Sequence, residues 1–150
     1  MTFSTKRRIE FRDTDAAGIV HFAAFFPMME SAEHEMLRSL GISVMPRHGI
    51  ESETAVTWPR VSAHCDFRSA ARFEDILEIS VQVVRMGQSS VEYQFKFTRE
   101  DELIAEGTMT VVCCRVPGIP GVLPNGGTAH KGLEKVSIPD SIRDLLSKHC

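Results

Sequence analysis

One segment with helical periodicity stands among segments that alternate like strands, and this contrast limits the folds open to the chain. Residues 23–40 form the predicted helix. Its apolar stripe consists of Phe22, Phe25, Phe26, Met29, Met36 and Leu40. Pro27 falls in the first turn, where a missing N–H costs little, and Gly41 favours an end to the helix.

Five segments alternate apolar and polar residues with the period of a half-buried strand. They cover residues 2–12, 55–68, 75–85, 90–99 and 103–116. Four of them follow one another along the chain, so they can form an antiparallel meander. A single amphipathic helix and a single large sheet must bury their apolar faces against each other. The sequence therefore predicts an α+β fold, in which a five-stranded antiparallel sheet wraps around one long central helix.

Size and composition predict one domain over residues 1–150. The chain is 43% hydrophobic and 25% charged, which is ordinary for a globular protein. Residues 117–132 are predicted to be a loop, and residues 139–148 a short C-terminal helix. The net charge of -3 is spread over both halves, so we expect neither a nucleic-acid partner nor a polybasic membrane contact.

The uncharged stretches and the cysteines indicate the cellular compartment in which the protein is expected. The longest uncharged stretch that contains no turn cluster, residues 16–29, is too short to span a bilayer, so we expect no membrane segment. The chain holds Cys65, Cys113, Cys114 and Cys150, whose spacing fits no zinc or redox motif. Buried, reduced thiols are the expected state, which predicts a cytoplasmic protein.

The link between the first strand and the helix can carry chemistry. Asp15 lies in a turn that ends at Gly18, just before the predicted helix begins. Backbone N–H groups at a helix start lack partners, lie at the positive end of the dipole and can stabilise an oxyanion. A carboxylate beside them can attack a carbonyl or activate water. The ordinary alternative stays open at this point, because an Asp before a helix is usually a turn or cap residue.

The same link resembles the active-site signature of the 4-hydroxybenzoyl-CoA thioesterase family, whose members have the hotdog fold. The matching residues are Arg8-Ile9, Thr14-Asp15, Gly18-Ile19-Val20, Phe22 and Phe25, and the layout agrees over about residues 3–116. The resemblance implies an acyl-CoA thioesterase in which Asp15 is the nucleophile or general base. It also implies that the Phe22 backbone N–H polarises the thioester carbonyl and that Gly18 permits a tight approach.

The resemblance further implies a homodimer or homotetramer with active sites at the subunit interface. No metal and no resident cofactor are expected, because CoA enters as part of the substrate and leaves as product. The turn that contains Gly87, Ser89 and Ser90 is a candidate contact for the CoA arm, although most such turns are only turns.

Two further candidate substrate contacts have structural alternatives. His21 either lines the acyl pocket or is a satisfied histidine at the helix start. Glu33 lies inside the apolar stripe, where a carboxylate must be paired, protonated or at a wet edge. Pairing is the favoured role for Glu33. Another branch of hotdog thioesterases has its catalytic acid on the central helix, so Glu33 or Glu30 is the fallback acid.

Two other activities fit the same predicted fold. A hotdog dehydratase would use His21 with an acid on an acyl-CoA or acyl-carrier-protein substrate. A non-catalytic protein would bind acyl-CoA without turnover. The sequence favours hydrolysis and leaves the acyl group, aryl or alkyl, open.

Overall fold

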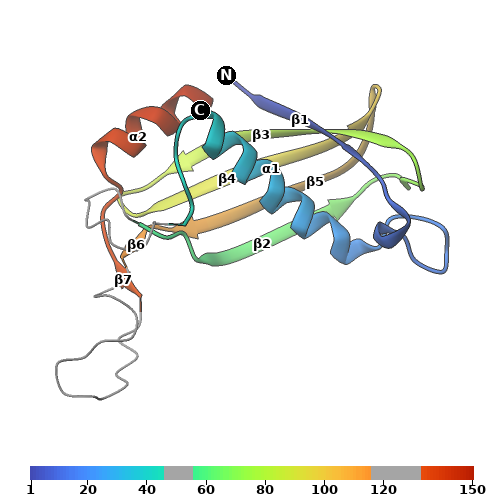
Figure 1. Ribbon diagram of the computed structural model, residues 1–150, viewed down its shortest axis with the longest axis horizontal. Helices are drawn as coiled ribbons and strands as arrows, with labels where there is room; N and C mark the ends of the chain where they lie inside the picture. The colour runs from blue at the N-terminus through green and yellow to red at the C-terminus, as the bar shows by residue number, and fades with distance from the viewer. Residues whose placement is uncertain (46–55, 116–132) are drawn as a thin grey trace, which may run out of the picture.

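The computed structural model describes residues 1–45, 56–115 and 133–150. The main elements are β1 (Phe3–Arg8), α1 (Phe25–Ser39), β2 (Arg60–Phe67), β3 (Ile76–Met86), β4 (Ser90–Arg99) and β5 (Glu102–Val112). The five strands form one antiparallel sheet in the order β1-β3-β4-β5-β2, and α1 lies across one face of it (Figure 1). The predicted α+β architecture is confirmed. The predicted loop 117–132 lies outside the described residues.

Alternation along β4 shows how the sheet buries one face. Val91, Tyr93, Phe95 and Phe97 are almost completely buried. The residues between them remain partly or fully exposed, because successive side chains of a strand point to opposite faces. The buried face meets the stripe of α1, in which Met29 and Met36 have no exposed surface. Within the described residues, no helix is long and apolar enough to cross a membrane.

Gly107 in β5 lets the helix lie close to the sheet. A Cβ atom at this position would lie 2.5 Å from the sulfur of Met29 and 2.8 Å from the carbonyl oxygen of His64. Real Cβ atoms are not found at such distances, so any side chain here would push the helix or β2 away.

Several elements end earlier than predicted because local hydrogen bonds interrupt the regular pattern. The strand expected over residues 2–12 stops at Arg8, and Phe11–Asp13 forms a 3₁₀ turn closed by a bond from Asp13 N to Glu10 O. The helix expected over 23–40 begins as a 3₁₀ turn at Phe22–Ala24 and continues as α1.

The end of the chain also departs from the expected pattern. The strand expected over 103–116 is interrupted after Val112, and β6 (Cys114–Arg115) pairs instead with β7 (Glu134–Lys135). The predicted C-terminal helix is present as α2 (Asp140–Leu146), followed by a 3₁₀ turn at Ser147–His149.

Strand β2 lies at the edge of the sheet and has an uncovered apolar side. Its alternation suggests a buried face, yet Val61 is 61% exposed, Phe67 is 49% exposed and Ala63 is exposed as well. Among the described strands β2 pairs only with β5, so its other edge presents unpaired backbone groups.

Candidate active site

Asp15 is held in a tight loop between β1 and α1. An antiparallel bridge between Thr14 and Val20 closes the loop, and Asp15 N donates to Ile19 O at 3.0 Å. The Asp15 Oδ1 atom accepts a hydrogen bond from Ala17 N at 2.8 Å. No described residue donates to Oδ2, and the side chain is exposed. One carboxylate oxygen therefore fixes the side chain while the other faces outward.

Gly18 supplies the backbone conformation that closes this loop. Its φ of +76° lies in the left-handed region, which disfavours a residue with a Cβ atom. A Cβ atom here would have nothing within 4 Å, so crowding inside the chain is not the reason for the glycine. Its predicted contact with substrate stays a prediction.

The 3₁₀ turn at Phe22–Ala24 presents a free donor. Among the described residues, no acceptor binds the Phe22 N–H, and the Phe22 side chain is 62% exposed. His21 caps the turn, because its Nδ1 accepts a hydrogen bond from Ala23 N at 3.0 Å. This contact supports the helix-start role of His21, while a contact with substrate stays a prediction.

Glu33 is completely buried in the middle of α1 and is paired with Arg60 at the start of β2. The distances are 2.6 Å between Glu33 Oε2 and Arg60 Nη2, and 2.9 Å between Oε1 and Nη1. Burial raises the pKa of Glu33, and the hydrogen bond and charge of Arg60 act in the opposite direction. Both oxygens face Arg60, which supports the pairing role over a direct role in catalysis.

The turn at residues 87–90 lies at the other end of the sheet from Asp15. It joins β3 to β4 beside α2, where Arg143 donates to Gly87 O at 2.8 Å and Ser89 is buried (Figure 1). The Asp15 loop lies where β3 begins, since Val20 N donates to Ala71 O. An 11-residue strand is about 35 Å long. One chain therefore does not bring Gly87, Ser89 or Ser90 to Asp15.

Sequence reasoning missed the partner of Glu33. The position of Glu33 inside an apolar stripe showed that a partner was needed, but Arg60 lies 27 residues away in the sequence. An arginine at the start of an edge strand gives no local sign of this role.

Comparisons with known proteins place the chain in a family. Residues 9–146 match the model of the thioesterase-like superfamily. The chain is 34% identical to a 1,4-dihydroxy-2-naphthoyl-CoA hydrolase of Prochlorococcus marinus over 104 residues, which are 67% of each protein. It is 24% identical over 111 residues to the acyl-CoA thioesterase YbgC of Haemophilus influenzae, covering 74% of this chain and 79% of the relative.

A solved structure shows the same fold at lower sequence identity. It is a variant of 4-hydroxybenzoyl-CoA thioesterase complexed with 4-hydroxybenzoyl-CoA. The TM-score is 0.80 at 18% identity, and the match covers 97% of this chain and 98% of that one. The sheet and helix described above are therefore those of a hotdog fold. With a family model that covers almost its whole length, the chain belongs to the thioesterase-like superfamily.

Proposed function

We propose that this protein hydrolyses an acyl-CoA thioester to a carboxylate and free CoA. The observation that carries the proposal is the outward-facing carboxylate of Asp15, in a loop that leads directly to the free N–H of Phe22. This arrangement pairs a nucleophile or base with a donor for the carbonyl oxygen. The family and the relatives support the same reaction.

The Phe22 N–H would donate to the thioester oxygen as negative charge develops there. In the general-base form, Asp15 takes a proton from water, whose oxygen forms the new bond to the acyl carbon. The carbon–sulfur bond then breaks, and the CoA thiolate takes up the proton. In the nucleophilic form, an Asp15 oxygen bonds to the acyl carbon first, and the carbon–sulfur bond breaks to release the CoA thiolate. Water then hydrolyses the resulting anhydride, which releases the acyl carboxylate, restores the Asp15 carboxylate and supplies the proton that the thiolate takes up.

Asp15→Asn tests the proposal with little change in shape, because the amide oxygen can still accept from Ala17 N. We expect kcat to fall at least about 100-fold, the usual scale of acid–base and nucleophilic contributions. Thiol release would be measured with benzoyl-, hydroxybenzoyl-, phenylacetyl- and straight-chain acyl-CoAs. Asp13→Asn is the matched control, since Asp13 Oδ2 accepts Glu10 N in the turn before the loop.

An undiminished rate for Asp15→Asn on its best substrate would refute the assignment. Loss of water from a hydroxyacyl thioester with the thioester intact would support the dehydratase instead. Tight binding without turnover over the whole panel would support a non-catalytic acyl-CoA-binding protein.

We also propose that two chains pair through β2 and share their sites. The exposed Val61, Ala63 and Phe67 and the unpaired edge of β2 favour a second strand there. An antiparallel pair would place the start of the partner's β2, and with it the 87–90 turn, beside this chain's Asp15. Sedimentation of wild type and Val61→Glu tests this arrangement: we expect a dimer or a dimer of dimers that dissociates in the variant. A monomeric, fully active wild type would refute it.

A further inference from the structure

The loop that carries Asp15 is attached to the turn before β3. Val20 N donates to Ala71 O at 2.8 Å, and Ile19 pairs with Arg72 in an antiparallel bridge. Ile19 O also accepts the hydrogen bond from Asp15 N at 3.0 Å. The position of the Asp15 backbone therefore depends on where this turn lies.

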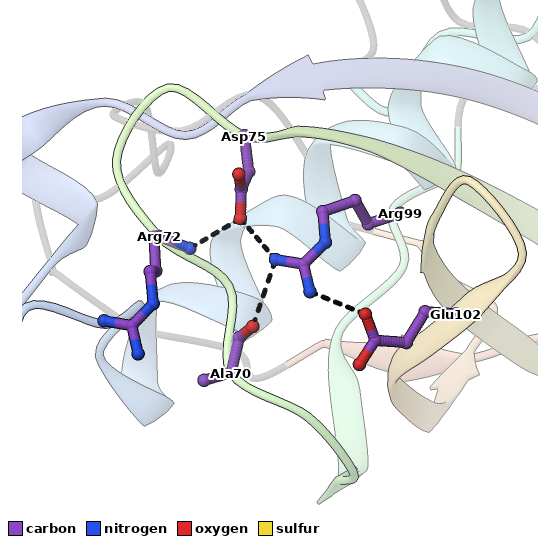
Figure 2. Close-up of polar contacts among 5 residues, drawn as sticks. All are labelled: Ala70, Arg72, Asp75, Arg99 and Glu102. Carbon is purple, nitrogen blue, oxygen red and sulfur yellow. Dashed lines mark hydrogen bonds and ion pairs between the residues drawn. The ribbon is translucent and has the colours of Figure 1, made fainter.

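One guanidinium at the end of β4 holds the same turn, as Figure 2 shows. Arg99 Nη1 lies 2.6 Å from Asp75 Oδ2 and donates to Ala70 O at 3.3 Å. Asp75 Oδ2 also accepts a hydrogen bond from Arg72 N at 2.8 Å. Arg99 is oriented by Glu102, whose Oε2 lies 2.6 Å from Nη2. Arg99 thus fastens both ends of the turn to β4, one end through the ion pair with Asp75 and the other through the hydrogen bond to Ala70 O.

The conformation of the turn explains why it needs to be held. Glu74 has a φ of 70°, in the left-handed region that disfavours residues with a Cβ atom.

Burial raises the pKa of Asp75, but the hydrogen bonds from Arg72 N and Arg99, together with the charge of Arg99, outweigh this effect and lower the pKa overall. Asp75 is therefore an anion at neutral pH and pairs with Arg99 as a full charge.

We propose that Asp75 and Arg99 are positioning residues, whose ion pair sets the turn at residues 70–75 and, through it, the Asp15 loop. The catalytic consequence rests on the proposed function, whereas the structural coupling does not. Among the described residues, neither side chain has a hydrogen bond to the Asp15 loop. They act through the main-chain bonds of Ala71 and Arg72 to the loop.

A second ion pair provides a matched control. Arg68, the residue after β2, pairs with Glu106 in β5 at an N–O distance of 2.7 Å, close to the 2.6 Å between Arg99 and Asp75. In the hydrogen bonds of the described residues, Glu106 has no connection to the Asp15 loop. Glu106→Gln therefore removes a carboxylate that forms a similar ion pair. It leaves unchanged the contacts that join the turn at residues 70–75 to the Asp15 loop.

The test compares Asp75→Asn, Arg99→Lys and Glu106→Gln with wild type. Amide hydrogen exchange comes first: in Asp75→Asn we expect Asp15 and Val20 to exchange at least about 10-fold faster, while β4 amides keep their protection. Thioester hydrolysis comes second: we expect kcat to fall about 10- to 100-fold with KM changed less than about 3-fold, because the loop is misplaced while binding surfaces remain.

Arg99→Lys should lie between wild type and Asp75→Asn in both measurements, because one ammonium keeps the charge near Asp75 but cannot also reach Ala70 and Glu102. It also keeps the proposal testable if Asp75→Asn does not fold. Glu106→Gln should match wild type in both measurements.

Unchanged exchange at Asp15 and Val20 in a folded Asp75 or Arg99 variant would overturn the coupling. Faster exchange with wild-type kcat would overturn the role in catalysis. An equal loss of kcat in Glu106→Gln would show a general stability effect and also overturn it. A wild type without hydrolysis on any thioester would refute the proposed function alone, and the exchange result would still decide the coupling.

Discussion

Removal of Arg60 and removal of Glu33 should have unequal effects on stability, although they break the same ion pair. Arg60→Met leaves a carboxylate with 0% exposure and no counter-charge at its oxygens. Removal of one partner of a buried pair costs about 3–5 kcal/mol. Glu33→Gln leaves a guanidinium that is 26% exposed and 3.4 Å from Glu30. Glu33→Gln should therefore lower the free energy of unfolding by about 1.5–3 kcal/mol, the scale of hydrogen bonds to a charged group.

Thermal unfolding makes this difference measurable. For a chain of this length, 1 kcal/mol shifts Tm by about 2–4 °C. Tm should therefore fall by about 6–20 °C in Arg60→Met and by about 3–12 °C in Glu33→Gln. Both variants and wild type should be compared at one protein concentration, because association stabilises the folded state by mass action.

The pH dependence of stability gives an independent check. Burial raises the pKa of folded Glu33 above its ordinary value of 4.5, and loss of Arg60 removes the interactions that oppose this rise. A group with a raised folded pKa contributes stability that is fully present below the unfolded pKa and is lost as pH rises through the folded pKa. Arg60→Met should therefore gain stability between pH 7 and pH 5, by at most about 1.4 kcal/mol per pH unit.

The double variant Arg60→Met/Glu33→Gln is the matched control, because it lacks the titrating carboxyl group. Its free energy of unfolding should change less over the same pH range. Equal losses in the two single variants, or identical pH profiles for Arg60→Met and the double variant, would refute the reasoning. If Glu33→Gln lost as much kcat as Asp15→Asn, the catalytic acid would lie on α1 instead.

Three smaller predictions concern single positions. Gly107→Ala should lower the free energy of unfolding by about 1–3 kcal/mol, since its Cβ would lie 2.5 Å from Met29 Sδ; an unchanged Tm would contradict this. Gly18→Ala should cost about 1–2 kcal/mol through its φ of +76°, and Gly18→Asn less, because Asn tolerates this region; equal denaturant midpoints would argue against strain. Burial raises the pKa of Cys113 to about 11, so at pH 8 a thiol reagent should label exposed Cys150 first and Cys113 later, as peptide mapping would show.

The elements that the sequence predicted well are those governed by local periodicity. The alternation of β4 and the stripe of α1 arise from burial along one face, and both are found as expected. The end of β1 at Arg8 was not predicted, because the bond from Asp13 N to Glu10 O overrides the alternating pattern. The residues of the Asp15 loop were identified through their resemblance to a family, since an Asp in a turn is by itself uninformative.

Contacts between segments that are distant in the sequence could not be predicted from local sequence patterns. Nothing around Asp75 or Arg99 shows that a charge at the end of β4 would hold the turn before β3. The apolar residues of β2, such as Val61, alternate as in a buried strand, but the sheet order places them at an edge. Strand order depends on which segments pair across the whole chain, and the sequence predicted only that neighbours can pair.

The separation of Asp15 from the turn at residues 87–90 has a genetic consequence in a two-fold dimer. Each site would use the loop of one subunit and the turn of the other. A subunit with a disabled loop and a subunit with a disabled turn could then complement each other, because their mixed dimer keeps one intact site and concentrates both defects in the second. After gene duplication, one copy could lose a working Asp15 loop and the other a working turn at residues 87–90. The two copies would then be active only as an obligate pair.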